Sequence, residues 1–174
     1  IECHSRGKQH HYYYSAKTTW NTFMRDLHAI SVNLGCEQSK VKLFISDAGK
    51  GITGNIFETF SNYKYLIDYF HASEHISNFI RELGEKNKKQ MAKWRTELTS
   101  LLYKSKIKEL VNRMKEIRGG KRKKVLRREE QYFMKHEAHF DYSTFRQHKW
   151  RIGSGKIESV CRWLIQQRFK QSGM

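Results

Sequence analysis

Two carboxylate residues stand where they could hold a divalent metal ion. Asp47 follows Val41–Ile45 (VKLFI), a short apolar run that predicts a buried strand ending in a turn. Glu158 lies in IGSGKIES (residues 152–159), where Ser154 is suited to cap a final helix. Hard divalent cations prefer carboxylate oxygens, and phosphoryl transfer uses such ions to activate the attacking oxygen and stabilise the leaving one. The pair therefore suggests a metal-dependent phosphoryl-transfer site.

The same two residues also fit a purely structural role. Asp47 could cap the helix that follows it, and Glu158 could pair with Arg162 four residues further along a helix. Spacing alone favours this structural role. A catalytic role therefore needs support from the rest of the chain.

The elements around Asp47 predict an α/β arrangement. An amphipathic helix is expected over residues 18–34, because its apolar residues recur at spacings of three and four before Gly35. A helix over residues 54–60 and a buried strand over residues 65–70 should follow Asp47. Strand, helix and strand make a right-handed parallel unit, whose ligands gather beyond the carboxyl ends of the strands. Asp68 should lie near that same edge.

The chain divides into three predicted parts. Residues 1–83 hold the strands and helices around the first carboxylate. Residues 84–141 read as a helical insertion that contains a basic, solvated loop at residues 118–128. Residues 142–174 end in the helix that carries the second carboxylate. A length of 174 residues suits one domain with an insertion better than two full domains.

The charge of the chain points to a polyanionic partner. Lys and Arg number 34 against 17 Asp and Glu, which gives a formal charge of +17. Nucleic acid is the leading candidate, and a membrane is not expected because no apolar stretch approaches the roughly 20 residues needed to span one. Three widely spaced cysteines indicate neither a disulfide framework nor a zinc site, so a reducing compartment is expected. From charge and position, the residues expected to contact phosphates are Lys121, Arg122, Lys123, Lys124, Lys156, Arg162, Arg168 and Lys170.

The segment HASEH (residues 71–75) offers a rival chemistry. It matches H-x-x-E-H, in which two histidines four apart on a helix bind zinc and the glutamate acts as base. That site needs a helix at His71, yet His71 directly follows a strand-like run and the helix is expected to begin near Ser73. A zinc peptidase is therefore the least favoured hypothesis. His71 could instead lie beside the metal site or contact DNA, or simply pack.

Four segments taken in order carry a family resemblance. They are FISDAGKGI (44–52), LIDYFHASEH (66–75), YFMKHEAHFDYSTFRQHKWRIGSGKIES (132–159) and RFKQSGM (168–174). As an ordered set they resemble a bacterial insertion-sequence transposase of the DDE class, of the Kra type, which is more distantly related to Mutator-like enzymes. The resemblance covers most of the chain from about Tyr13 onwards.

The resemblance implies a ribonuclease H-like fold in which two aspartates and one glutamate hold two divalent metals, Mg²⁺ or Mn²⁺. Asp47 matches the second aspartate and Glu158 matches the glutamate. Asp68 and His71 would lie close to the metals without binding them. The first aspartate belongs on an opening strand followed by two more strands, and no matching motif precedes Tyr13, so that first strand is expected to be missing. Family members also more often show Asp-Gly-Ala where this chain has Asp-Ala-Gly.

The implied function is metal-dependent cleavage and transfer of DNA strands in transposition, in the cytoplasm of a bacterium. The partners would be transposon ends and target DNA, and a homo-oligomeric complex on that DNA is one arrangement the resemblance allows. Because two of three metal ligands bind metal poorly, this chain alone is expected to be inactive unless a longer parent polypeptide supplies the first aspartate. The alternative is a non-catalytic DNA-binding module.

Overall fold

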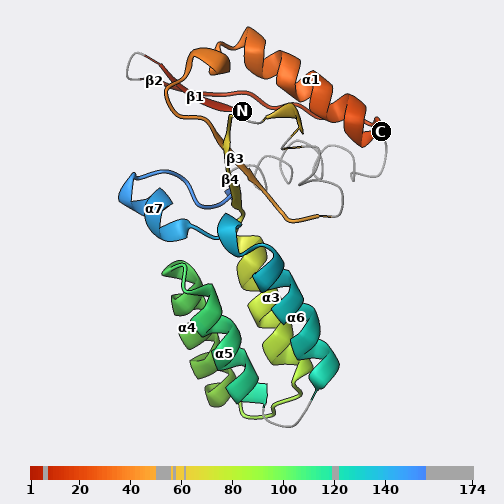
Figure 1. Cartoon of the computed structure of the whole chain (residues 1–174), viewed down its shortest axis with the longest axis vertical. Helices are drawn as coiled ribbons and strands as arrows, with labels where there is room; N and C mark the ends of the chain where they lie inside the picture. Colours follow the sequence, from red (N-terminus) through yellow and green to blue (C-terminus); the bar gives the residue numbers. More distant parts are fainter. Residues whose placement is uncertain (6–7, 50–55, 57, 61, 119–121, 156–174) are drawn as a thin grey trace, which may run out of the picture. The chain divides into compact units, whose positions relative to one another are not determined.

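The structure is a computed structural model that describes residues 1–5, 8–49, 56, 58–60, 62–118 and 122–155 (Figure 1). It divides into two compact units, which are described separately. Unit 1 comprises Ile1–Phe44 and Ala48–Tyr65, and unit 2 comprises Ile45–Asp47 and Leu66–Met174. Within the described ranges, no helix is both long enough and apolar enough to cross a membrane.

Unit 1 begins with a hairpin and a long helix. Strands β1 (Glu2–Ser5) and β2 (Lys8–His11) pair in antiparallel fashion. Helix α1 (Trp20–Asn33) follows, and Thr19 caps its N-terminus through the side-chain oxygen. Gly35 adopts a left-handed conformation with φ of 75° just after the helix, which a residue with a Cβ rarely adopts. The predicted helix and its glycine stop are confirmed.

Aromatic side chains fill the core of unit 1. The short 3-10 helix η1 (Cys36–Gln38) turns the chain after α1. Met24 of α1 is 1% exposed, and Phe60 is 4% exposed. The Phe60 ring lies 5.1 Å from the Phe44 ring and 5.0 Å from the Tyr63 ring, measured between centroids. Such clusters bury large apolar surfaces and hold α1 onto the segment that follows β3.

A two-stranded parallel sheet is made by β3 (Leu43–Ser46) and β4 (Lys64–Ile67). The first strand lies close to its predicted place. The second ends three residues earlier than predicted, because Asp68 caps a helix and so takes Tyr69 and Phe70 out of the strand. Of the helix predicted over residues 54–60, residues 54, 55 and 57 lie outside the described residues, while Ile56, Glu58 and Thr59 are helical.

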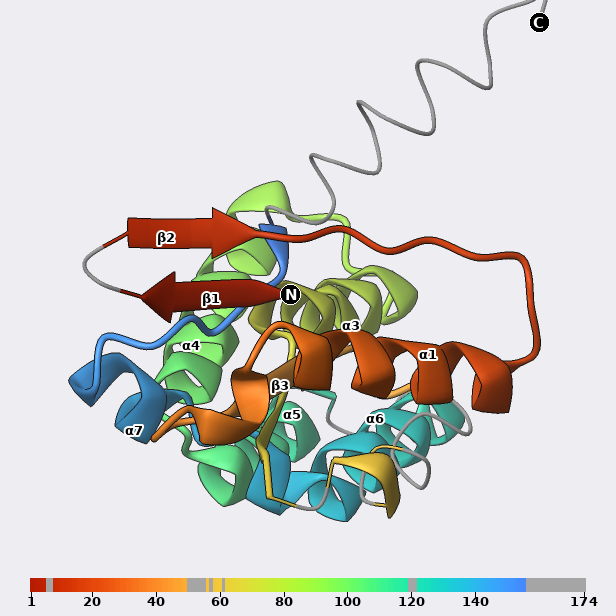
Figure 2. The same cartoon turned by 90° about the horizontal axis from the view of Figure 1, so that it is seen from above.

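The first four helices after β4 form a bundle in unit 2. They are α3 (Tyr69–Glu82), α4 (Lys88–Tyr103), α5 (Ile107–Arg118) and α6 (Lys123–Lys135). Successive helices pack against each other, and α6 also packs against α3 (Figures 1 and 2). Their shared core contains fully buried side chains from every helix, including Ile76, Phe79, Leu98, Leu102, Leu110, Met114 and Phe133.

Two sequence-based boundaries in this unit were wrong. Helix α3 begins at Tyr69 rather than near Ser73, because the side chain of Asp68 supplies the N-terminal cap. Helix α6 begins at Lys123, so most of the predicted basic loop at residues 118–128 is helical. Leu126, which is 7% exposed, begins the buried apolar face of α6. Packing of this face stabilises the helix despite the basic residues around Leu126.

The chain then returns to the sheet. The short 3-10 helix η2 (Glu137–His139) leads into α7 (Tyr142–Gln147), which Asp141 caps. The buried Tyr142 hydroxyl donates a hydrogen bond of 3.0 Å to the carbonyl oxygen of Ile67 at the end of β4. The fold is therefore a mixed α/β one, mostly helical, with a small parallel sheet whose carboxyl end meets the last described segment.

Candidate active site at the carboxyl ends of β3 and β4

The two strands of the parallel sheet end side by side, and an aspartate follows each. The backbone N–H of Asp68 donates a hydrogen bond of 2.8 Å to the carbonyl oxygen of Ser46. Asp47 is therefore next to the start of α3 along the same edge of the sheet. Its side chain is exposed, and among the described residues no group donates a hydrogen bond to its carboxylate. The structural alternative, in which Asp47 caps the following helix, is not tested, because residues 50–55 between Asp47 and the helical residue Ile56 lie outside the described residues.

Asp68 is buried and fully engaged. The residue is 3% exposed. Its Oδ1 accepts hydrogen bonds from the backbone N–H groups of Phe70, at 2.7 Å, and His71, at 3.1 Å. Its Oδ2 accepts a third from the backbone N–H of Ser154. One carboxylate therefore caps α3 and also holds a turn that is 86 residues away in the sequence.

The turn at residues 152–155 is held at a second point. The backbone N–H of Tyr69 donates to the carbonyl oxygen of Ile152 at 2.9 Å. This bond and those of Asp68 satisfy the first three N–H groups of α3, which have no partner inside the helix. A Cβ at Gly153 would lie 2.7 Å from two carbon atoms of the Phe70 ring, which is closer than real contacts allow. The first glycine of the IGSG turn therefore permits the close approach of Phe70, and a side chain there would displace the Phe70 ring.

These contacts bring together three of the segments that the sequence singled out. Asp47, Asp68 and the 152–155 turn meet at the carboxyl end of the sheet. Glu158 lies three residues beyond Gly155, outside the described residues, as do Lys121, Lys156, Arg162, Arg168 and Lys170. Arg122, Lys123 and Lys124 are described, and all three are exposed.

An implied metal ion can be compared with the donors at this edge. Asp47 offers an exposed carboxylate, which is the donor type that Mg²⁺ and Mn²⁺ prefer. Asp68 offers little, because three N–H groups already occupy its oxygens. In the described ranges, no group of three or more His, Cys, Asp or Glu side chains is arranged to hold a metal. The described residues thus fit one ligand of a metal site, and a complete site would need carboxylates from elsewhere.

The two histidines of HASEH lie on the same face of α3, with ring centroids 5.2 Å apart. His75 packs into the interface with α6, where its Nδ1 lies 2.7 Å from Oε2 of Glu129 and its ring stacks on Tyr132 at 3.7 Å. Glu74 points outwards, with 75% of its side chain exposed. The late helix start was the wrong objection to a zinc site. The better objection is that His75 is part of a helix interface and that the described residues provide no third ligand.

Glu129 is a buried charge that the sequence analysis missed. It is 1% exposed, and its Oε1 lies 2.6 Å from Nε of Arg128. The Nη2 atom of Arg128 lies 2.7 Å from Oε1 of Glu82. The network links α3 to α6, and the hydrogen bond from Arg128 holds the pKa of Glu82 below its usual value. The available signal was the position of Glu129 three residues after Leu126, on the apolar stripe of α6.

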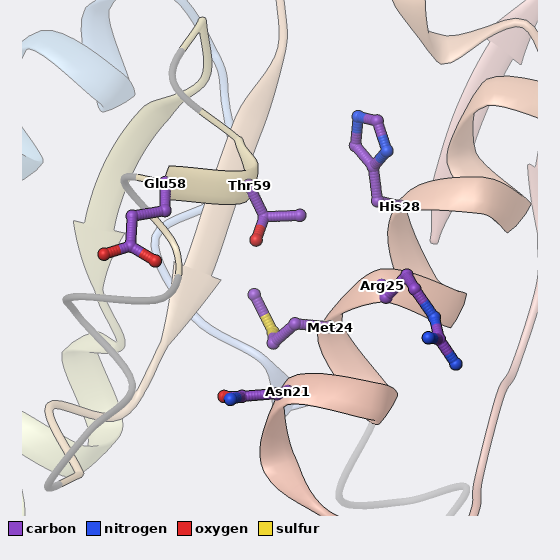
Figure 3. Close-up of a pocket in the computed structure, with 6 residues that line it drawn as sticks. All are labelled: Asn21, Met24, Arg25, His28, Glu58 and Thr59. Carbon is purple, nitrogen blue, oxygen red and sulfur yellow. The ribbon is translucent and has the colours of Figure 1, made fainter.

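Unit 1 contains a separate pocket of about 260 Å³ (Figure 3). Met24 and Thr59 point toward each other across it, while the carboxylate of Glu58 is turned outwards. The other lining residues are Asn21, Arg25 and His28 of α1. None of these residues comes from the strand ends, and the charged groups do not converge. The pocket therefore lacks the donor set of a catalytic site.

Comparison of the chain with protein-family models, with curated proteins and with solved structures gave no match.

Proposed function

We propose that the chain is part of the catalytic domain of a DDE-class transposase with a ribonuclease H-like fold, which cleaves and transfers DNA strands with Mg²⁺ or Mn²⁺. One observation carries the proposal: Asp68 binds the backbone of Ser154, so the turn that leads to Glu158 lies at the carboxyl end of the sheet, beside Asp47. Two segments more than a hundred residues apart thus reach one edge. A catalytic centre that combines a carboxylate from each segment requires the two segments to lie close together.

The order of the elements also supports the proposal. An antiparallel hairpin, β1 and β2, precedes α1, in the place where the resemblance implies two strands after the opening one. A parallel pair then carries Asp47 at its end, and a block of helices separates it from the IGSG turn. The same order of strands, helical insertion and final carboxylate is implied by the transposase family.

The residues at the strand ends would have different roles in this reaction. Bound divalent ions would neutralise charge on the transferring phosphate and activate the attacking oxygen. Asp47 would hold such an ion through its exposed carboxylate, with Glu158 as its partner. Asp68 would keep the turn before Glu158 fixed, because its oxygens are already occupied by backbone N–H groups. The formal charge of +17 would attract the DNA.

The test is cleavage of duplex DNA, in the presence of Mg²⁺ or Mn²⁺, by a parent polypeptide that contains this chain and supplies the first aspartate. Nicking that requires metal, and that is lost in both Asp47→Ala and Glu158→Ala, is the result expected of the enzyme. Glu74→Ala is the matched control, because it removes an equally exposed carboxylate from the neighbouring helix. Nicking that survives both substitutions would overturn the assignment.

Metal binding can be followed without catalysis. Mn²⁺ broadens the NMR signals of nuclei near its binding site, even when binding is weak. The amide signals of Asp47 and Ser154 should broaden first, and the effect should be lost in Asp47→Asn. Broadening confined to other parts of the chain would contradict a metal site at the strand ends.

A non-catalytic DNA-binding module is the second candidate. The observation that favours it is the formal charge of +17, which supports DNA binding without a metal centre. DNA binding that falls steeply with salt, without nicking and without any effect of Mg²⁺ or Mn²⁺, would favour the module over the enzyme.

A further inference from the structure

The helices of unit 2 bring two loops together at one end. Helices α3 and α5 end there, and α4 and α6 begin there (Figure 1). A Cβ at Gly84, just after α3, would lie 3.9 Å from Nη2 of Arg122, just before α6. Residues 81–89 and the described residues of 116–124 therefore form one surface, which we call the bundle tip.

The bundle tip is strongly basic. In the described ranges its cations are Arg81, Lys86, Lys88, Lys89, Arg118, Arg122, Lys123 and Lys124. Its carboxylates are already engaged: Glu82 pairs with Arg128, Glu116 pairs with Arg113, and Glu85 accepts a hydrogen bond from the backbone N–H of Asn87. In the described ranges the eight cations therefore exceed the three carboxylates at this end, which leaves a net positive charge.

Most of these cations point into solvent without a partner. Lys86, Lys88 and Lys89 on one loop, with Lys123 and Lys124 at the start of α6, are exposed. None of the five forms an ion pair within the described part of the chain. Lysines gathered in this way attract a polyanion, and each DNA phosphate that they neutralise releases condensed cations from the DNA.

The chemistry of the surface favours duplex DNA over single strands. Proteins that hold single strands stack bases on aromatic side chains. The large exposed apolar residues of the described chain, which include Tyr13, Trp20, Phe70 and Tyr103, all lie outside the bundle tip. A lysine-rich surface without aromatic residues contacts phosphates rather than bases, so it reads no sequence.

The length of α3 sets the distance between the bundle tip and the candidate active site. The helix has 14 residues from Tyr69 to Glu82. At 1.5 Å per residue it spans about 21 Å. A duplex rises about 3.4 Å per base pair, so this length corresponds to roughly six base pairs.

We propose that the bundle tip binds the sugar-phosphate backbone of duplex DNA, roughly six base pairs from the phosphate handled at the strand ends. The distance rests on the proposed function, whereas the binding surface does not. The bundle tip thereby adds Lys86, Lys88 and Lys89 to the phosphate contacts expected from the sequence. It also gives the helical block between the two catalytic segments a role in holding DNA.

The experiment compares two variants of the full chain that lose the same charge. The test variant is Lys86→Gln/Lys88→Gln/Lys123→Gln/Lys124→Gln. The control variant is Lys17→Gln/Lys40→Gln/Lys93→Gln/Lys104→Gln, whose lysines are equally exposed but scattered. Binding to a labelled duplex is measured between about 50 and 200 mM salt, and the slope of log K against log salt is read from each series.

Each phosphate contact contributes about 0.9 to that slope, so losing four contacts should flatten it by up to about 3.6. The control variant should keep a slope close to that of the wild type. Equal slopes for the two variants would overturn the role of the bundle tip. An equal loss of affinity for single strands and for duplex would overturn the assignment to duplex DNA.

The outcomes separate this inference from the proposed function. A flatter slope in the test variant, with no metal-dependent nicking by the parent polypeptide that supplies the first aspartate, keeps the binding surface and rejects the enzyme. Metal-dependent nicking with equal slopes keeps the enzyme and rejects the surface. Both fall if the wild-type chain does not bind duplex DNA. Thermal unfolding of each variant checks that the exposed substitutions leave the fold intact.

Discussion

Asp68→Asn tests whether one carboxylate joins α3 to the IGSG turn. The asparagine side chain keeps one oxygen, which can still accept from the N–H groups of Phe70 and His71, and asparagine is a good helix cap. The other position becomes an NH₂ group, which faces the backbone N–H of Ser154. Two donors then meet, so the cap survives while the link to the turn is lost.

The cost follows from the hydrogen bond that is removed. A hydrogen bond to a charged acceptor contributes about 1.5–3 kcal/mol, and Asp68 is 3% exposed, so water does not readily replace the lost partner. We expect the free energy of unfolding to fall by about 1.5–3 kcal/mol in Asp68→Asn. Asp68→Ala should cost a further 0.5–2 kcal/mol, roughly, because it also removes the cap of α3.

Two measurements check this expectation. Chemical denaturation gives the change in the free energy of unfolding. Amide hydrogen exchange reports on the turn itself: protection of the Ser154 N–H should drop roughly 10- to 150-fold, while that of Phe70 should change little. Asp141→Asn is the matched control, because Asp141 caps α7 through Thr144 at 3.2 Å and accepts no bond from a distant segment.

The reasoning is refuted if Asp68→Asn and Asp141→Asn change stability equally and the exchange of Ser154 is unaltered. In that case the turn would be held by the bond from Tyr69 to Ile152 alone. Asp68 would then be an ordinary helix cap, and the observation that carries the proposed function would lose its weight.

Two further predictions concern packing and pH. Gly153→Ala should lower the free energy of unfolding by about 1–3 kcal/mol, because the added methyl group meets the Phe70 ring. Most of that loss should be recovered in the double variant Phe70→Ala/Gly153→Ala. If denaturation experiments show that the effects of the two substitutions simply add, the contact is contradicted. Burial lowers the pKa of His136 from its ordinary value of 6.5. As the pH falls, the unfolded chain therefore binds a proton at this histidine before the folded chain does. The resulting contribution to stability is present above pH 6.5 and is lost as the pH falls below that value. His136→Gln should therefore flatten the fall in unfolding free energy on the acid side of pH 6.5, as measured by denaturation at a series of pH values. Identical profiles for the wild type and the variant would show that His136 does not contribute in this way.

Local patterns predicted the elements whose signals agree with one another. Helix α1 has apolar residues at helical spacing, a threonine cap and a glycine stop, and the structure confirms all three. Strand β3 is a short apolar run before a turn, and it too lies close to its predicted place. In both cases, periodicity and boundary residues point to the same element.

Boundaries failed where two local signals conflicted. By hydrophobicity, the run YLIDYF predicts a single strand. Asp68 within it is a good N-cap, however, and α3 begins directly after it. The side chain of Asp68 accepts hydrogen bonds from N–H groups of the first turn, which have no partner inside the helix. Lys123 and Lys124 read as loop by charge, yet they open α6, because Leu126 and Phe133 bury on its inner face. In each case the packed side chains outweighed the average character of the segment.

The link that matters most for function could not be predicted from spacing at all. Asp68 and Ser154 are 86 residues apart, and nothing in either segment specifies the other. Their pairing depends on how the helical block folds back, which Tyr142 fixes by its hydrogen bond to the end of β4. The sequence could place both residues at element ends, but only tertiary packing brings those ends together.

The same pairing separates the roles of the two aspartates at the strand ends. A carboxylate has about four sites that accept hydrogen bonds or metal, and Asp68 uses three of them on backbone N–H groups while almost fully buried. The one site that remains, on Oδ2, belongs to a residue that is 3% exposed, so a hydrated metal ion has little access to it. Asp47 is exposed, and no described residue donates a hydrogen bond to its carboxylate, so a cation can reach it without a change in the fold. Under the proposed function, a metal at this edge would therefore be bound by Asp47, and Asp68 would keep the 152–155 turn at the strand ends.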